Sequence, residues 1–536
     1  MGDINWAWAW ALVDGLAAAG VRHAVISPGT RSAPLTLACL RHPALQCHTL
    51  LDERVAAFFA LGLAKADGVP ALVIGTSGSA PANWHPAVVE ADAGRHPMLL
   101  LSADRPLDDQ DCGANQTVSQ ERLFGPHLRA YHGLPEAQEA RGWLASLAAR
   151  AASQCLWPLP GPVQINLPFR EPLLGDCAEV ESLPVCKVTI PQARMDAQTA
   201  KTLAAKLSVQ PGIIIAGSEP QDATAIARLA EALDCPILAD PLSGLRFGKH
   251  DRSRVMTRGD LFLRGWKPKP AWVLRFGSVP VSMSMAHWDA EEIVVTGGPN
   301  WSDPSRRASW MIPAQGVAED LTPLVTPAAA GWCDSFRRAE AQVLPDVPEA
   351  AVHRVLLEAL PEGALLYLGN SMAVRDFDAF SGTSSKALTV ICNRGANGID
   401  GNLSTFLGAV ASGRFSAAAA LVGDLTFLHD IGGLAAGQGR QALLCVMDNG
   451  GGAIFGHLPQ AKLPEFSEGW LMPQEADISA AAAVWGHGYV RGAATDVAAS
   501  LERPGLTILH LPIDRQASTE AHRALWAAAS QLKEPT

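Results

Sequence analysis

Short apolar runs alternate with amphipathic segments through the first part of the chain. The runs typical of buried strands lie at 21–27, 46–51, 71–80, 98–106 and 161–168. Segments with the residue pattern of helices lie at 5–19, 33–41, 53–66 and 82–93. Because strands and helices alternate, this part of the chain predicts a parallel sheet with helices on both faces.

The same alternation returns twice more. A second block has strand-like runs at 211–220, 235–240, 271–278 and 291–298. A third block has such runs at 364–371, 387–395, 418–422, 442–447 and 506–512. Residues 172–197, which hold three prolines, read as a linker, and 320–350 as a connection around a short helix. We therefore predict an α/β fold with three doubly wound parallel-sheet domains, at 1–180, 198–330 and 350–536.

The most informative stretch joins the strands predicted at 418–422 and 442–447. A strand–connection–strand unit makes these strands parallel neighbours, with Asp424 and Asn449 beyond their carboxyl ends, where such sheets bind ligands. A carboxylate, an amide oxygen and backbone carbonyls suit Mg²⁺. The glycines at 450–452 let the backbone approach a diphosphate closely. Both side chains are also common in turns, so metal binding and a plain turn are about equally favoured from these two residues alone.

Glu53 is a second candidate, because it stands where a helix begins directly after a predicted strand. The helix dipole stabilises a carboxylate there. An ordinary acid of the first helical turn is the more common explanation of that position.

Four arginines also follow predicted strands by a few residues: Arg31, Arg105, Arg375 and Arg394. Arginine stays charged and binds carboxylates with two parallel hydrogen bonds. Any one of them is ordinary for a surface, but four at equivalent strand ends indicate a substrate with several carboxylates.

Composition excludes several other classes. The net charge of −11 argues against a nucleic-acid partner. The ten cysteines include no CxxC pair, which favours reduced thiols over a zinc or disulfide framework. The N-terminus does not resemble a signal peptide and apolar stretches are too short for a membrane span, so we expect a cytoplasmic protein. Nine Lys and Arg residues in 246–275 are more simply read as a solvated face than as an effector site.

These residues together resemble the thiamine-diphosphate-dependent enzymes. Their cofactor motif is Gly-Asp-Gly followed after some 25–30 residues by Asn, and Gly423-Asp424 with Asn449 matches it except that Leu425 replaces the second glycine. Within that superfamily the chain resembles the 2-succinyl-5-enolpyruvyl-6-hydroxy-3-cyclohexene-1-carboxylate synthases. The similar stretches are SPGTRSAPLTLA (27–38), LDERVAAFFALGLAK (51–65), TSGSAPAN (76–83), SADRP (102–106), DCGANQ (111–116), GNSMAVR (369–375), NRGANGIDGNLST (393–405) and GGAIF (451–455).

The resemblance implies a pyrimidine-binding, a middle and a diphosphate-binding domain. It implies that Glu53 bonds the pyrimidine of thiamine diphosphate and that Mg²⁺ or Mn²⁺ is held by Asp424, Asn449 and the Gly451 carbonyl. The other implied cofactor contacts are Ser371, Gly398, Ile399, Gly423, Leu425, Thr426 and Ile454. Arg31, Thr30 and Gln116 are implied in catalysis beside Glu53, and the implied substrate contacts are Arg31, Arg105, Asn115, Gln116, Arg375, Arg394, Phe455 and Leu458.

The implied reaction is the decarboxylation of 2-oxoglutarate and conjugate addition of the remaining unit to isochorismate, in menaquinone or phylloquinone biosynthesis. The implied assembly is a homodimer or homotetramer with active sites between subunits. Two alternatives remain. One is another thiamine-diphosphate-dependent 2-oxoacid decarboxylase or carboligase, and the other is a non-catalytic relative that binds ligands, although Glu53 and Asp424 are both present.

Overall fold

The computed structural model describes residues 1–219, 221–343 and 346–535. It contains three six-stranded sheets in which every strand pairing is parallel, which confirms the predicted α/β class. Three predictions include residues outside the described part. These are the strand at 211–220, the connection at 320–350 and the end of the third domain at 536. The limits predicted for the three domains stay a prediction.

A first compact unit consists of residues 1–191 together with 393–414 and 428–440. Its sheet has the order β2-β1-β3-β4-β6-β5. The strands are β1 (His23–Ile26), β2 (Gln46–Thr49), β3 (Ala71–Gly75), β4 (Met98–Asp104), β5 (Ala130–Gly133) and β6 (Pro162–Pro168). The helices are α1 (Gly2–Ala18), α2 (Ala33–Arg41), α3 (Glu53–Asp67), α4 (Ser79–Ala82), α5 (His85–Gly94), α6 (Leu144–Gln154) and α14 (Asn402–Ala411).

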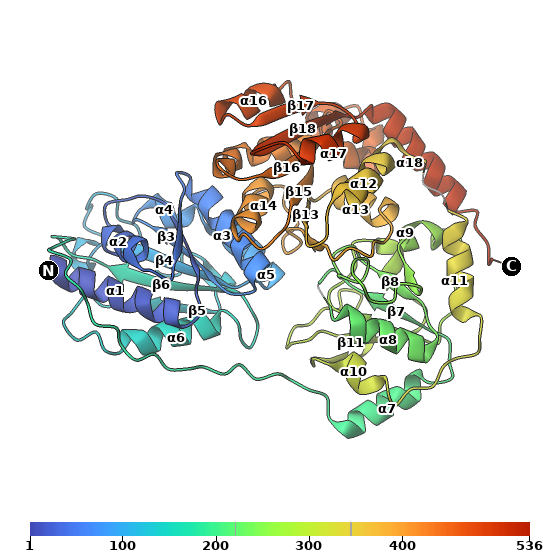
Figure 1. The fold of residues 1–536 in the computed structure, drawn as a ribbon, viewed down its shortest axis with the longest axis horizontal. Helices are drawn as coiled ribbons and strands as arrows, with labels where there is room; N and C mark the ends of the chain where they lie inside the picture. The colour runs from blue at the N-terminus through green and yellow to red at the C-terminus, as the bar shows by residue number, and fades with distance from the viewer. Residues whose placement is uncertain (220, 344–345, 536) are drawn as a thin grey trace. The chain divides into compact units, whose positions relative to one another are not determined.

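Helices cover both faces of this first sheet, as the alternation predicts. On one face α1 packs against α2 and α6, and Figure 1 shows α1 and α6 side by side along the sheet. Apolar side chains such as Leu99, Leu101 and Ile165 fill the core beneath them. On the other face α3 contacts β1, β3 and α5. The core thus holds the carboxyl ends of the central strands rigidly in one row.

Two glycines bring α3 and α14 into close contact within the first unit. A Cβ on Gly62 would collide with the carbonyl of Thr405, and a Cβ on Gly408 with the carbonyl of Phe59. The two backbones therefore approach one another more closely than side chains would permit. This contact holds the segment before α14 in the same unit as Glu53.

A second compact unit consists of residues 192–392, 415–427 and 441–536. Its middle sheet has the order β12-β11-β10-β7-β8-β9. The strands are β7 (Gly212–Ala216), β8 (Ile237–Ala239), β9 (Val255–Met256), β10 (Trp272–Phe276), β11 (Glu291–Val295) and β12 (Ala308–Ile312). The helices around it are α7 (Ala197–Leu207), α8 (Ala223–Leu233), α9 (Gly259–Phe262), α10 (Val317–Leu321) and α11 (Trp332–Ala341).

The third sheet, also in the second unit, has the order β14-β13-β15-β16-β18-β17. Its strands are β13 (Leu365–Leu368), β14 (Thr389–Ile391), β15 (Ala418–Gly423), β16 (Ala442–Asp448), β17 (Gly488–Arg491) and β18 (Leu506–Pro512). The remaining helices are α12 (Pro348–Ala359), α13 (Met372–Phe380), α15 (Asp424–His429), α16 (Ile478–Val484), α17 (Val497–Leu501) and α18 (Arg515–Ala529). Numbered within each sheet, the first and third share the order 2-1-3-4-6-5, whereas the middle sheet reads 3-2-1-4-5-6. Similar architecture in the first and third blocks is therefore present without visible sequence repetition.

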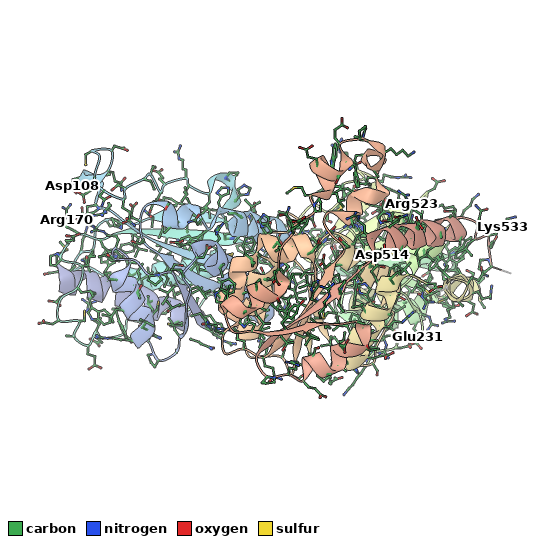
Figure 2. The ribbon with its side chains drawn as sticks, turned by 90° about the horizontal axis from the view of Figure 1, so that it is seen from above. Asp108, Arg170, Glu231, Asp514, Arg523 and Lys533 are labelled. Carbon is green, nitrogen blue, oxygen red and sulfur yellow. The ribbon has the colours of Figure 1, made fainter. Side chains whose placement is uncertain are left out.

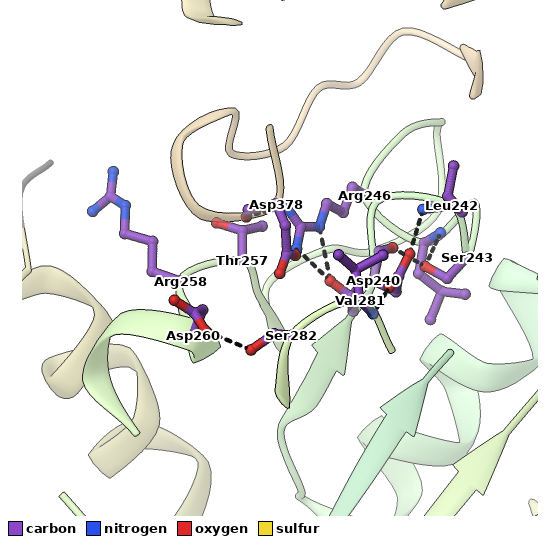
Figure 3. Close-up of polar contacts among 12 residues, drawn as sticks. Asp240, Leu242, Ser243, Arg246, Thr257, Arg258, Asp260, Val281, Ser282 and Asp378 are labelled. Atoms are coloured by element: carbon purple, nitrogen blue, oxygen red, sulfur yellow. Dashed lines mark hydrogen bonds and ion pairs between the residues drawn. The ribbon is translucent and has the colours of Figure 1, made fainter. Parts of the chain in front are cut away.

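The basic stretch 246–275 is not simply a solvated face, and that interpretation is wrong for Arg246 and Arg275. Arg246 is fully buried and forms an ion pair with Asp378 of α13, which Figure 3 shows together with its neighbours. Arg275 is 3% exposed and pairs with the buried carboxylate of Glu292 at 3.3 Å. Buried acidic side chains pair with these two arginines. The charge pattern along the sequence does not reveal such pairs, because the partners come from other segments of the fold. The effector-site alternative for the stretch stays untested.

No helix in the described part of the chain is long and apolar enough to cross a membrane. All ten cysteines lie in that part and are free, as their scattered spacing indicates.

The glycine contact between α3 and α14 generates a prediction on stability. Gly408→Ala should lower the free energy of unfolding by about 1–3 kcal/mol, the usual cost of overpacking, because the methyl group meets a backbone carbonyl of α3. Gly142→Ala is the matched control, since a Cβ there meets no described atom within 4 Å. Urea unfolding of the full chain measures both, and equal stabilities for the two variants would contradict the contact.

Candidate active site

Asp424 and Asn449 lie at the carboxyl ends of neighbouring parallel strands, as predicted. Asp424 is the first residue after β15 and is 6% exposed, and Asn449 is the first residue after β16. The Asp424 carboxylate accepts a hydrogen bond from the backbone N–H of Gly451 at 2.6 Å. That bond ties the loop after β16 to the end of β15, so the glycines and the two polar side chains belong to one site.

Two oxygen-bearing side chains of this site would be stabilised by a bound cation. Burial, and then the nearby charge of Asp448, raises the pKa of Asp424 to about 6. The Oδ1 atom of Asn449 is buried, and within the described residues it has no hydrogen-bond partner. A buried acceptor without a partner costs free energy that a bound cation would recover. The described part of the chain contains no group of three or more His, Cys, Asp or Glu arranged for a metal, so a cation here must also use carbonyl or ligand oxygens.

The loop after β16 is held in one conformation from several sides. Gly451 has φ +127°, and a Cβ there would collide with the carbonyl of Leu471, so only glycine fits. Arg515 at the start of α18 donates to the carbonyl of Gly450 at 3.0 Å. The Asp448 carboxylate accepts from the Gly450 N–H at 3.1 Å and lies 2.8 Å from Nε2 of His510. The loop is therefore preorganised by the chain itself.

Open space for a ligand adjoins this loop. A Cβ built on Gly423 would meet no described atom within 4 Å, which leaves the backbone at the end of β15 accessible. Leu425 is half-buried and Thr426 is buried at the start of α15. A short 3₁₀ turn, Ala453–His457, carries the half-buried Ile454 and Phe455, and Leu458 beyond it is 44% exposed.

Ser371 occupies a strained backbone position in the same unit. It immediately precedes α13 and has φ +66° and ψ −129°, a combination that is adopted almost only by glycine. Its carbonyl accepts a hydrogen bond from Arg375 at 2.6 Å. Backbone strain of this kind is common at ligand-binding sites, which makes Ser371 a candidate contact.

Glu53 is the first residue of α3 in the first unit, as expected. Asp52 caps the helix by accepting from the N–H of Arg54 at 2.9 Å, so Glu53 itself does not serve as the cap. The half-buried Glu53 carboxylate accepts a long hydrogen bond of 3.4 Å from Asn83. So weak a bond leaves the carboxylate available for a ligand.

The segment 393–401, which carries Arg394, Gly398 and Ile399, is anchored within the first unit by Glu90. This carboxylate of α5 is 3% exposed and accepts from the N–H groups of Gly395 at 2.9 Å and Ala396 at 2.7 Å. Gly398 and Ile399 are half-buried beyond this anchor. The first unit therefore contains Glu53 together with Arg394, Gly398 and Ile399, although they are far apart in sequence.

Arg31 and Arg105 lie near one another at the carboxyl ends of β1 and β4. Burial lowers the pKa of Arg31, and repulsion from the Arg105 charge lowers it further. Arg31 donates to the carbonyl of Phe169 at 2.7 Å, and its second nitrogen pairs with Glu171, whose carboxylate side chain is 69% exposed, at 3.0 Å. This position thus already binds a carboxylate. The Nε of Arg105 is buried without a partner among the described residues, which leaves a donor for a ligand oxygen.

Gln116 is fixed to the loop after β3 by a reciprocal pair of bonds. Its Nε2 donates to the carbonyl of Ser77 at 3.1 Å, and the Ser77 hydroxyl donates to its carbonyl at 3.0 Å. Asn115 next to it is exposed, and so is Thr30 in the loop after β1. These side chains line the same edge of the first sheet.

The structure thus collects the predicted residues into two sets, one in each unit. The first set is Glu53, Thr30, Arg31, Arg105, Asn115, Gln116, Arg394, Gly398 and Ile399. The second is Ser371, Arg375, Gly423, Asp424, Leu425, Thr426, Asn449, Gly451, Ile454, Phe455 and Leu458. Sequence reasoning missed Arg515, which the strand-end rule would have selected because it follows β18, and it missed buried polar residues on β4 and β6.

Comparisons with known proteins identify the family. Residues 8–123 match the model of the thiamine pyrophosphate (thiamine diphosphate) enzymes' N-terminal TPP binding domain. The 2-succinyl-5-enolpyruvyl-6-hydroxy-3-cyclohexene-1-carboxylate synthase of Dechloromonas aromatica is 44% identical, over 91% of this chain and 94% of its own. That of Geobacillus kaustophilus is 39% identical over 98% of both chains, and that of Halobacterium salinarum 36% over 96% of both. The chain belongs to this synthase family.

Membership in the synthase family makes the chain a thiamine-diphosphate-dependent enzyme. The fold agrees, because benzoylformate decarboxylase from Polynucleobacter necessarius superposes with a TM-score of 0.73 over 96% of this chain and 99% of its own. That protein is 17% identical, so the similarity extends to the fold alone.

The strain at Ser371 generates a prediction that separates stability from ligand binding. Ser371→Gly should raise the free energy of unfolding by about 1 kcal/mol by relieving the backbone, while weakening thiamine diphosphate binding because the hydroxyl is lost. Val209→Gly is the control, because the exposed Val209 also has positive φ (57°) but lies outside both sets. It should gain stability without loss of cofactor affinity. Thermal unfolding and cofactor titration measure the two effects, and unchanged affinity in Ser371→Gly would exclude a role for this hydroxyl.

Proposed function

We propose that this chain decarboxylates 2-oxoglutarate with thiamine diphosphate and adds the remaining four-carbon unit to isochorismate. The product is 2-succinyl-5-enolpyruvyl-6-hydroxy-3-cyclohexene-1-carboxylate, a precursor of menaquinone or phylloquinone. The observation that carries the proposal is a buried carboxylate beside a partnerless amide oxygen at the third sheet, in a chain whose first sheet carries neighbouring guanidinium groups. Its relatives, named as this synthase, align over at least 91% of the chain.

In this proposal a divalent cation, Mg²⁺ or Mn²⁺, is held by Asp424, Asn449 and the carbonyl of Gly451. The partnerless Oδ1 of Asn449 and the raised pKa of Asp424 support that assignment, because neither group has a positive partner among the described residues. Arg515 and His510 fix the conformation of the loop after β16, which would hold the cation. The backbone after Gly423, with Ser371, lies where the diphosphate oxygens would be bound.

Glu53 is proposed to hold a proton at the pyrimidine ring nitrogen of the cofactor. A carboxylate at a helix start, with its cap supplied by Asp52, is free to accept or donate that proton. When bound, thiamine diphosphate supplies an electron sink for the carbon that loses CO₂. Ile399 and Gly398 contribute an apolar contact and a backbone group beside it.

The arginines are proposed to bind the carboxylates of the two substrates. Each substrate is a dianion, and Arg31, Arg105, Arg375 and Arg394 supply four permanent positive charges. The present pairing of Arg31 with Glu171 supports this assignment, since the site already accommodates a carboxylate. Asn115, Gln116 and Thr30 add neutral hydrogen-bonding groups, and Phe455 with Leu458 adds apolar surface.

The assembly is proposed to be a homodimer or homotetramer. Glu53 and Asp424 lie in different compact units, so a cofactor that contacts both requires the two units of one or of two subunits to meet. We propose that they come from neighbouring subunits.

Another thiamine-diphosphate-dependent 2-oxoacid decarboxylase or carboligase is the second candidate. It is favoured by the fold shared with a benzoylformate decarboxylase, and it predicts turnover of a monocarboxylate oxoacid. Pyruvate offered in place of 2-oxoglutarate separates the two candidates, because it lacks the second carboxylate that an arginine would bind.

The central prediction concerns turnover of the two proposed substrates. Purified chain with thiamine diphosphate, Mg²⁺, 2-oxoglutarate and isochorismate should release CO₂ and consume isochorismate, whereas pyruvate should not replace 2-oxoglutarate. Glu53→Gln should reduce turnover by roughly 10²–10⁴-fold with the cofactor still bound, because it removes the proton-holding group. Folded protein without product, or faster turnover of pyruvate, would overturn the proposal.

The control for that assay is Asp3→Asn. Asp3 is also an acidic residue in the first turn of a helix of the first unit, and its carboxylate accepts from the N–H of Asp176 at 2.7 Å. If Glu53 were an ordinary first-turn acid, both variants would change turnover equally little.

The cation site predicts a pH dependence of binding. Burial raises the Asp424 pKa to about 6, so a proton competes with the metal for this carboxylate below that pH. The stabilisation of the fold by Mg²⁺ with thiamine diphosphate, measured as the shift in melting temperature, should be larger at about pH 7.5 than at about pH 5.5. Asp424→Asn should weaken the metal by roughly 10-fold or more and flatten that difference.

The matched control is Asp477→Asn, which alters the exposed cap of α16 in the same unit. It should retain the wild-type response to metal and pH. An Asp424→Asn variant with an undiminished metal-dependent shift would remove Asp424 from the metal site.

A further inference from the structure

Two neighbouring strands of the first sheet carry a row of buried polar side chains where a core usually has apolar ones. Ser102 and Asp104 stand two residues apart on β4, and Gln164 and Asn166 stand two residues apart on β6. Ser102 pairs with Asn166 in the register of the two strands, so all four side chains lie on one face of the sheet. Their exposed fractions are between 0% and 7%. Burying four polar groups is costly unless they bond to one another, and such a network usually has a specific purpose.

Asn166 is the centre of this network. Its Nδ2 donates to the Asp104 carboxylate at 2.7 Å, and its Oδ1 accepts from the Ser102 hydroxyl at 2.7 Å. The same Oδ1 accepts from Nε2 of Gln120 at 2.7 Å. Gln164 completes the row by donating to Ser102 at 2.9 Å. Each group thus has its orientation set by the next.

One end of the network lies beside the two arginines. Asp104 is the last residue of β4, and its second carboxylate oxygen accepts from the N–H of Arg105 at 2.7 Å. Burial raises the pKa of Asp104, while the nearby charge of Arg31 lowers it, so Arg31 stabilises the ionised carboxylate. Asp104 is therefore bonded to the backbone of Arg105 and lies close enough to Arg31 for that charge to lower its pKa.

The other end holds the loop that carries Asn115 and Gln116. Gln120 is 1% exposed and is the one buried residue between positions 107 and 123, all of which the structure describes. Besides its bond to Asn166 it donates to the carbonyl of Ala103 at 3.2 Å. The other residues of the loop are half-buried or exposed, so Gln120 is its buried anchor, in addition to the bonds between Gln116 and Ser77.

We infer that Asp104, Asn166 and Gln120 are positioning residues, which hold Arg31 and Arg105 and the loop of Asn115 and Gln116 in one arrangement for a carboxylate-bearing substrate. The inference rests on the proposed function for the identity of that substrate. Asp104 fixes the backbone at Arg105 before substrate arrives, and Asn166 connects Asp104 to Gln120 of the loop. The substrate therefore meets donors that are already oriented, so fewer groups have to be ordered when it binds.

The test is Asp104→Asn, which keeps the shape but removes the charge and one acceptor. The KM of one of the two carboxylate substrates should rise about 10-fold with kcat changed less than about threefold, the effect of losing one hydrogen bond to a charged group used in binding. Amide hydrogen exchange of residues 107–120, measured on the full chain without substrate, should become faster. Gln120→Met, which removes only the buried anchor, should give the same faster exchange.

A double variant separates positioning from general damage. In Asp104→Asn with Asn166→Asp, the amide and the carboxylate exchange places. The new amide on β4 accepts from the N–H of Arg105 and donates to the new carboxylate on β6, which in turn accepts from Ser102 and Gln120. Slow exchange of the loop and most of the substrate affinity should return, and the two single changes should therefore be strongly non-additive.

The matched control is Asp108→Asn. Asp108 lies on the same loop but points outward to Arg170 in an exposed ion pair (Figure 2), and such pairs contribute little. It should change neither KM nor exchange.

Unchanged exchange and unchanged KM values in Asp104→Asn, or additive effects in the double variant, would overturn the inference. Because exchange is measured without substrate, a failure of the proposed function is distinguishable. In that case the loop would loosen in the variants while the wild-type chain turned over neither substrate.

Discussion

A buried carboxylate and a buried amide oxygen that lack a positive partner among the described residues set the main constraint on this molecule. Asp424 and Asn449 come together because β15 and β16 are adjacent and parallel, so both side chains emerge at one edge. Neither is favourable there without a cation. The glycines of the loop, the carbonyl of Leu471 behind Gly451, and Arg515 all fix the loop in the form that exposes these oxygens. The fold thus leaves two buried oxygens in an arrangement that the proposed cation would stabilise.

The first sheet also holds like charges close together, but here they are positive. Arg31 and Arg105 repel one another, and the fold retains them through the carbonyl of Phe169, the carboxylate of Glu171 and the buried Asp104. Guanidinium groups at one sheet and an unpaired carboxylate with an amide oxygen at another are consistent with the proposed substrates and cation. The first and third sheets share one strand order, and candidate site residues follow strand ends in both.

The sequence predicted most of the fold because buried parallel strands are continuous apolar runs, as in 98–104 and 442–447. The predicted helix at 33–41 matches α2 in both limits, and α3 begins at Glu53 as expected. Four strands were missed: β5, β9, β12 and β17. Each lies at the edge of its sheet and is only two to five residues long, so its apolar pattern is weak. The predicted helix at 82–93 corresponds to α5, which begins three residues later with Pro86 in its first turn, and the short α4 before it was not predicted.

Site residues that directly follow strands could be predicted from the sequence. Residues that come together only through tertiary contacts could not. Asp424, Asn449 and Glu53 were found from position alone, but their chemical roles came from resemblance to the family. The network of Asp104, Asn166 and Gln120 joins residues up to 62 positions apart. The alternation of polar residues in SAD and QIN gives a faint signal for it, but Gln120 gives none. The burial of Arg246 beside Asp378 is equally invisible, since 132 positions separate the partners.

The most direct test of the account asks whether Glu53 and Asp424 act in one active site made by two subunits. Glu53→Gln and Asp424→Asn chains, each inactive alone, are co-expressed, and CO₂ release from 2-oxoglutarate with isochorismate is measured. If the site forms between subunits of a dimer, half of the randomly assembled dimers are hybrids with one intact site, and activity should recover to about one quarter of wild type. Co-expressed chains that assemble but remain as inactive as either variant alone would contradict the account.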